Sequence, residues 1–82
     1  MVTREQIIAD LNSRMAEEFE IEESIITPDA IIFDTLELDS ISLIDLVSII
    51  HVNYGIKMSK EELPQIKTFR DLYDYVESHL NN

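Results

Sequence analysis

Residues 39–55 read DSISLIDLVSIIHVNYG, and this stretch predicts the clearest helix of the chain. Asp39 is a residue type that caps helix starts, because its carboxylate accepts hydrogen bonds from the unpaired N–H groups of the first turn. The helix should run through Tyr54 and end at Gly55, since glycine readily adopts the left-handed conformation that closes helices. Apolar residues recur along it at helical spacing, and we expect this stripe to face the core: Ile41, Ile44, Val47 and Ile50.

Similar start signals predict a helix on each side of this one. Thr3 and Gln6 have the spacing of a capping box, and the apolar residues that follow share one helical face: Ile7, Ile8, Leu11, Met15 and Phe19. Thr68 can cap a final helix with Asp71 in its first turn. The inward residues of that final helix should be Phe69, Leu72, Tyr73, Val76 and Leu80.

The connecting segments set the rest of the architecture. Residues 20–38 break the helical period and predict a long loop, with a turn at residues 27–29 and four apolar residues that hold it down: Ile31, Phe33, Leu36 and Leu38. Ser59 and Glu62 suggest another capping box for a short helix or turn, which Pro64 keeps from extending. We therefore expect one all-α domain over residues 1–82, a small bundle of three main helices plus one short helix. Residues after Leu80 should fray.

Composition narrows the classes of function. Seventeen acidic residues against six basic ones give a formal net charge of -11, which disfavours nucleic-acid binding and favours partners with basic patches. The chain has no Cys and therefore no disulfide or thiolate zinc site. Its longest apolar run, at residues 30–33, is far below the roughly 20 residues that span a bilayer. The first six residues lack the apolar core of a signal peptide, so we expect a soluble, cytoplasmic protein without membrane insertion. We also expect it to be a monomer.

The sequence does not support a metal site. If Asp34 opened a calcium loop, Leu36 and Leu38 would stand where oxygen ligands are needed. His51 and His79 lie on different predicted helices, and neither has a second ligand three or four residues away. We therefore predict that no metal is bound.

Ser40 is a candidate nucleophile at a helix start, but the sequence gives it no base. His51 lies eleven residues further along the same helix, about 16 Å at 1.5 Å per residue, which is far beyond hydrogen-bond reach. We therefore expect no catalytic residue and no enzymatic activity. A helix start also suits a covalently attached phosphate, because its N–H groups stabilise an anion. Plain capping chemistry explains an Asp-Ser pair equally well.

Several separate stretches together resemble the acyl carrier protein family. Residues 26–29 (ITPD) resemble its loop entry, and residues 33–41 (FDTLELDSI) resemble its modification site. Residues 54–56 (YGI) resemble the exit of its second helix, and residues 66–71 (IKTFRD) the start of its last helix. The resemblance runs through nearly the whole chain and implies an acyl-carrier-protein-like fold.

The resemblance also implies a function. A phosphopantetheinyl transferase would move 4′-phosphopantetheine from coenzyme A onto Ser40, and the chain would carry acyl intermediates as thioesters on that covalent arm. Asp39 would orient the site and assist recognition. Ile41 and Ile44 would line the space beside the arm, or else belong to the plain core, while Asp45 and Val52 would contact partners. Those partners would include acyl-loading, ketosynthase-type and other acyl-processing enzymes.

Some positions depart from the family pattern. Glu37 stands where many members have Gly, and Ile41 where Leu is more usual. The second helix of general fatty-acid carriers is acidic, whereas this one has Ser42, His51, Val52 and Asn53 at positions that are usually acidic there. We therefore expect a carrier dedicated to a particular fatty-acid, polyketide or polyene pathway. An aminoacyl or peptidyl carrier is one alternative, and an acidic helical interaction domain without a prosthetic group is another.

Overall fold

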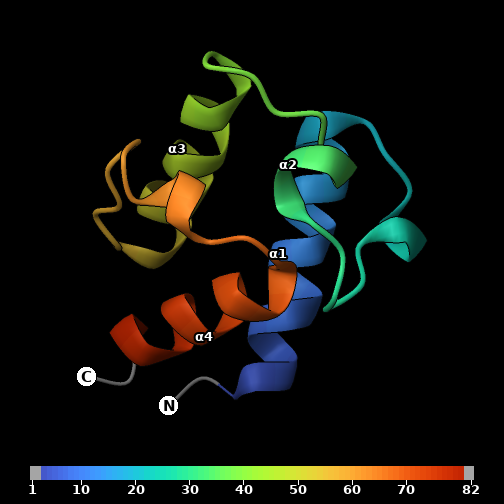
Figure 1. Ribbon diagram of the computed structural model, residues 1–82. Coiled ribbons are helices and arrows are strands. Elements are labelled where there is room, and N and C mark those ends of the chain that lie inside the picture. Colours follow the sequence, from blue (N-terminus) through green and yellow to red (C-terminus); the bar gives the residue numbers. More distant parts are fainter. Residues whose placement is uncertain (1–2, 81–82) are drawn as a thin grey trace.

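Three long helices make up most of the fold in the computed structural model, which describes residues 3–80 (Figure 1). They are α1 (Arg4–Phe19), α3 (Ser42–Tyr54) and α4 (Phe69–Leu80). A short helix, α2 (Ile32–Thr35), and two 3-10 turns, η1 (Glu23–Ile25) and η2 (Leu63–Gln65), lie between them. The predicted all-α architecture is confirmed, and residues 3–80 contain no β-strand. The fraying expected after Leu80 concerns residues outside the described range.

Helix α1 begins and ends on local hydrogen bonds. The Gln6 N–H donates to Thr3 Oγ1 at 3.2 Å, and the Thr3 N–H donates to Gln6 Oε1 at 3.0 Å, which confirms the predicted capping box. At the other end Glu20 takes the left-handed conformation, with φ 54° and ψ 48°. The predicted inward face is confirmed, with Ile7, Leu11 and Met15 buried and Ile8 and Phe19 half-buried.

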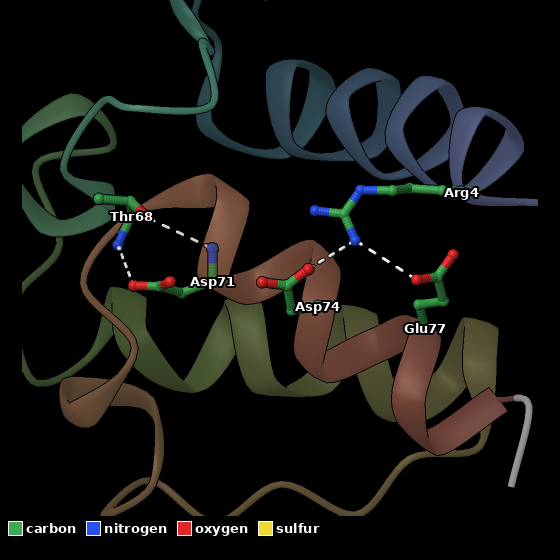
Figure 2. Close-up of polar contacts among 5 residues, drawn as sticks. All are labelled: Arg4, Thr68, Asp71, Asp74 and Glu77. Atoms are coloured by element: carbon green, nitrogen blue, oxygen red, sulfur yellow. Dashed lines mark hydrogen bonds and ion pairs between the residues drawn. The ribbon is translucent and has the colours of Figure 1, made fainter.

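Helix α4 packs across α1 and starts on the predicted cap. The Asp71 N–H donates to Thr68 Oγ1 at 3.3 Å, and the Thr68 N–H donates to Asp71 Oδ2 at 3.5 Å (Figure 2). The Arg4 guanidinium reaches from α1 to two α4 carboxylates, at 2.6 Å from Asp74 and 3.4 Å from Glu77 (Figure 2). Four predicted core residues are buried and the fifth, Leu80, is half-buried; the four are Phe69, Leu72, Tyr73 and Val76.

The segment between α1 and α3 is more structured than a loop. Its predicted turn is present, because the Ala30 N–H donates to the Thr27 carbonyl at 3.1 Å. Of the four predicted apolar anchors, Leu36 is buried and Phe33 and Leu38 are half-buried, but Ile31 is 42% exposed. The prediction for Ile31 was wrong because its backbone pairs with Thr68 in an isolated bridge while the neighbouring Ile32 fills the core. Ile26 is a second buried anchor that the pattern missed.

Backbone hydrogen bonds attach this segment to the start of α4. The Arg70 N–H donates to the Pro28 carbonyl at 2.9 Å, and the Phe69 N–H donates to the Ala30 carbonyl at 3.3 Å. In return the Ile32 N–H donates to the Lys67 carbonyl at 2.9 Å. Two N–H groups of the first turn of α4 therefore find acceptors outside their own helix, as helix starts require.

The predicted short helix or turn after Ser59 is present as a turn and a 3-10 helix, without an α-helix. The Glu62 N–H does donate to Ser59 Oγ at 3.2 Å, but the Glu62 carboxylate accepts a hydrogen bond from the Tyr75 phenol at 2.8 Å rather than completing a capping box. With Pro64 at its start, this region forms one 3-10 turn, η2. The short α-helix of the fold is instead α2, within the segment that we predicted as loop. Across residues 3–80, no helix has both the length and the apolar character needed to cross a membrane.

Candidate functional site

Ser40 is exposed in the turn that directly precedes α3. Asp39 holds this turn, because one of its carboxylate oxygens accepts hydrogen bonds from the N–H groups of Ile41 at 2.9 Å and Ser42 at 2.8 Å. The Asp39 carbonyl also accepts from the Leu43 N–H at 3.0 Å. The predicted capping role of Asp39 is confirmed, although α3 begins at Ser42, so that Ser40 stands just outside the helix.

The electrostatics of Asp39 follow from these bonds. The Ser42 N–H, and after it the Ile41 N–H, lower the pKa of the Asp39 carboxyl below its ordinary value. A carboxylate that is stabilised in this way is a weak base. Asp39 therefore fixes the backbone beside Ser40 and holds a negative charge there.

Glu37 gives the approach to the site its shape. Its φ is 52°, in the left-handed region that residues with a Cβ rarely adopt. The next residue, Leu38, donates its N–H to the Phe33 carbonyl at 3.0 Å, so the chain turns sharply after α2 before it reaches Ser40. Many acyl carrier proteins have Gly at the position of Glu37, and the left-handed backbone at this position explains that preference.

Helix α3 turns a different face inward from the one predicted. Its buried residues are Leu43, Leu46 and Ile50, whereas Ile41 is 74% exposed and Ile44 is 50% exposed. The predicted stripe was wrong at its first two positions because α3 carries apolar residues on more than one face, and spacing alone does not say which face packs. Ile41 and Ile44 are therefore not core residues, which removes one of their two interpretations.

The exposed face of α3 gathers the predicted contact residues. Ile41, Asp45 and Val52 are exposed at spacings that place them along one side of the helix, and Ile44 lies beside them. Val52 is 77% exposed. The structure thus presents all four residues to solvent on the helix that follows Ser40.

A groove between α1 and α3 was not predicted from the sequence. Its larger part measures about 350 Å³, and a contiguous part measures about 260 Å³. Glu18, Ile49 and Asn53 line both parts. Glu17, Glu18 and Glu20 also line its larger part, but no local pattern of the sequence indicates a groove, because it depends on how α1 and α3 are placed.

The residues around Ser40 fit a covalent phosphate group. Within residues 3–80, no three His, Asp or Glu side chains come together as a metal site would require. His51 is exposed in the last turn of α3, and His79 stacks on the Tyr75 ring at 4.1 Å between centroids in α4. An exposed serine at the start of a 13-residue helix matches the chemistry of phosphodiester attachment.

Comparisons with known proteins agree with this geometry. A family model described as "Phosphopantetheine attachment site" matches residues 9–76. The acyl carrier protein of Thermotoga maritima is 34% identical over 80 residues, covering 98% of this chain and 99% of the relative. The acyl carrier protein of Coprothermobacter proteolyticus is 36% identical over 77 residues, covering 94% of each. A meromycolate extension acyl carrier protein of Mycobacterium leprae is 34% identical over 76 residues, covering 93% of this chain and 66% of the relative.

These matches identify the class of protein and its cofactor. The family model covers most of the chain, and it describes the site at which 4′-phosphopantetheine is covalently bound. Members of the acyl carrier protein family are carriers without catalytic activity of their own. They interact with phosphopantetheinyl transferases and with acyl-processing enzymes. With the helical bundle, the family match and the near full-length relatives in agreement, the chain belongs to the phosphopantetheine-binding acyl carrier protein family and serves as an acyl carrier.

Proposed function

We propose that Ser40 is the attachment residue for the 4′-phosphopantetheine arm, that Asp39 orients it, and that residues 1–82 act as one carrier domain. The observation that carries the proposal is the exposed turn at Ser40. The Asp39 carboxylate fixes this turn, because it accepts hydrogen bonds from the N–H groups of Ser42 at 2.8 Å and Ile41 at 2.9 Å, at the start of α3. The serine lies inside the region that the family model matches.

In the attachment step this chain contributes the Ser40 hydroxyl, and the transferase contributes the base. The Ser40 oxygen forms a bond to the phosphorus that bears pantetheine in coenzyme A, the bond from that phosphorus to adenosine 3′,5′-bisphosphate breaks, and the serine proton passes to a base of the phosphopantetheinyl transferase. The N-terminus of α3 then lies beside the phosphodiester anion, and its dipole favours that charge. The chain has no Cys, so the thiol that holds an acyl group belongs to the cofactor.

We also propose a carrier dedicated to one fatty-acid, polyketide or polyene pathway. The exposed side of α3 presents Ile44 and Val52 beside Asp45, and Ile41 is exposed directly before the helix, so a partner that docks there meets apolar as well as charged side chains. The proposal is tested by offering the acylated chain and the host's main acyl carrier protein to the general fatty-acid elongation enzymes. Extension at equal efficiency on both carriers would refute a dedicated role.

Intact mass tests the attachment site directly. The purified chain is incubated with coenzyme A and a broad-specificity phosphopantetheinyl transferase, and we expect the wild-type mass to rise by one phosphopantetheine. Ser40→Ala should show no gain, whereas the control Ser42→Ala, two residues away, should still be modified. An unmodified wild type, or a gain that survives in Ser40→Ala, would contradict the assignment. Circular dichroism establishes that each variant is folded.

A further inference from the structure

Glu37 lies in the short segment that connects α2 to the start of α3 (Figure 1). Contacts on both sides hold its backbone in the left-handed conformation, with φ 52°. The buried Leu36 donates its N–H to the Ile32 carbonyl at 3.0 Å. The half-buried Leu38 donates its N–H to the Phe33 carbonyl, also at 3.0 Å. The turn therefore fixes the direction in which the Glu37 side chain leaves the backbone.

The Glu37 carboxylate is exposed, and within residues 3–80 no ion pair involves it. The three arginines of the chain pair with other carboxylates: Arg4 with Asp74 and Glu77, Arg14 with Asp10, and Arg70 with Asp29. Asp39, two residues after Glu37, uses its carboxylate to accept two backbone N–H groups. Glu37 thus carries the carboxylate nearest to Ser40 in sequence that the fold itself does not use.

The fold gains nothing from a glutamate at position 37. A left-handed backbone is unfavourable for a residue with a Cβ, and no ion pair within residues 3–80 offsets that cost. Residues held in such conformations concentrate at functional sites. The Cα atoms of Glu37 and Ser40 are at most about 11 Å apart, at 3.8 Å per residue. An enzyme that reaches the Ser40 hydroxyl therefore also covers the surroundings of Glu37.

We propose that Glu37 is a specificity-determining residue of the attachment step, recognised by a Lys or Arg side chain of the phosphopantetheinyl transferase from the same organism. Such a transferase pairs the carboxylate when it binds the turn that carries Ser40. A transferase with a neutral or acidic side chain at that point leaves the charge unpaired and binds more weakly. The inference rests on the proposed function, because Ser40 must be the residue that this transferase modifies.

The pair between Glu37 and the transferase acts on binding rather than on the exchange of bonds at phosphorus. It forms when the two proteins dock, and it is present both before and during the transfer. Its loss should therefore raise the KM for the carrier and leave kcat nearly unchanged. A change that only disturbed the turn at Ser40 would instead lower kcat, because the hydroxyl would be misplaced.

Steady-state transfer from coenzyme A, followed by intact mass, provides the test with the transferase from the same organism. Glu37→Gln removes the charge but keeps a Cβ, and Glu37→Asp keeps the charge on a shorter side chain. The matched control, Glu61→Gln, removes one exposed carboxylate beyond the opposite end of α3. Circular dichroism establishes that each variant is folded.

We expect Glu37→Gln to raise KM at least fivefold at low salt, with kcat within about twofold of the wild type and a smaller difference in KM at high salt. Glu37→Asp and Glu61→Gln should stay within about twofold of the wild type in both constants. An unchanged KM in Glu37→Gln, an equal rise in Glu61→Gln, or a loss confined to kcat would overturn the proposal.

Glu37→Gly separates recognition from folding. Glycine avoids the cost of the left-handed backbone, so the variant should unfold at a temperature no lower than the wild type, yet its KM should rise as in Glu37→Gln. A glycine variant that is modified as well as the wild type would also refute the inference. Failure of the proposed function itself looks different, because the wild type would then gain no mass or Ser40→Ala would still gain it.

Discussion

The phenol of Tyr73 in α4 donates a hydrogen bond to the amide oxygen of Asn12 in α1, and both side chains are buried. Asn12 is the one buried polar residue of the core among those described. Because each group satisfies the other, the bond joins the two helices at a point where an unpaired polar group would be costly.

Replacing one member of this pair should destabilise the fold. In Asn12→Ala the Tyr73 hydroxyl loses its acceptor inside the core, and we expect the free energy of unfolding to fall by about 2 kcal/mol. Urea denaturation measures the change. The double variant Asn12→Leu/Tyr73→Phe removes both polar groups and should recover most of the loss. If the double variant is no more stable than the single one, the hydrogen bond is not the reason for the cost.

The three tyrosines should ionise late in an alkaline titration. Burial, and secondly the Glu62 carboxylate, raise the pKa of Tyr75 to about 12. Burial is also the main reason that the pKa values of Tyr54 and Tyr73 lie above their ordinary value, and the Asp10 carboxylate adds to the effect at Tyr54. Because these pKa values are higher in the folded chain than in the unfolded chain, the neutral phenols contribute fully to the free energy of unfolding below about pH 10. That contribution is lost as the pH rises through the pKa values of the folded chain.

Ultraviolet absorbance of tyrosinate measures this titration. The folded chain should form little tyrosinate near pH 10, whereas the chain in guanidinium chloride should be about half ionised there. Tyr75→Phe should remove the component that titrates at about 12. A folded-state midpoint near 10 for all three phenols would contradict the burial and hydrogen bonding described for them.

Glycine at position 37 should stabilise the chain. The left-handed backbone of Glu37 carries a steric cost that glycine avoids, which is partly offset by the greater freedom of glycine in the unfolded state. We expect Glu37→Gly to raise the free energy of unfolding by about 0.5 kcal/mol. Glu37→Ala is the control, since it removes the same charge but keeps a Cβ, and it should bring no such gain. Thermal unfolding compares the two.

Loss of the Asp39 carboxylate should slow modification more than it disturbs the fold. In Asp39→Ala the N–H groups of Ile41 and Ser42 lose their acceptor, so the turn that carries Ser40 is no longer fixed. We expect the transferase rate on this variant to fall at least tenfold while the helical circular dichroism changes little. Asp39→Asn keeps an acceptor oxygen and should retain more activity. Equal rates for all three proteins would show that the bonds do not position Ser40.

The sequence predicted those features that depend on neighbouring residues. The capping box of α1, the Thr68 cap of α4, the turn at residues 27–29 and the Gly55 end of α3 arise from contacts over a few residues, and each is present. The hydrogen bonds of Asp39 are also local, because its carboxylate accepts from N–H groups two and three residues away. The choice of Ser40 as the attachment residue rested on the family resemblance and stays a prediction, because plain capping chemistry explains an Asp-Ser pair equally well.

The features that depend on distant partners could not be predicted. Ile41 and Leu43 are both apolar, and which of them faces inward is decided by the helices that pack against α3. The Tyr73–Asn12 bond joins residues 61 positions apart. Glu62 had the spacing of a capping residue, yet its carboxylate bonds to Tyr75 because α4 brings that phenol within reach. The groove beside α3 also requires the placement of α1.

The backbone bonds between residues 28–32 and residues 67–70 have a consequence for local opening. Because the amides of Phe69 and Arg70 are protected by carbonyls of the distant segment, they can exchange with deuterium only when that segment lifts away from α4. The amide of Ile32 is held by the same contact from the opposite side. These three amides should therefore share one opening free energy, as a single opening unit whose members lie almost forty residues apart in the chain.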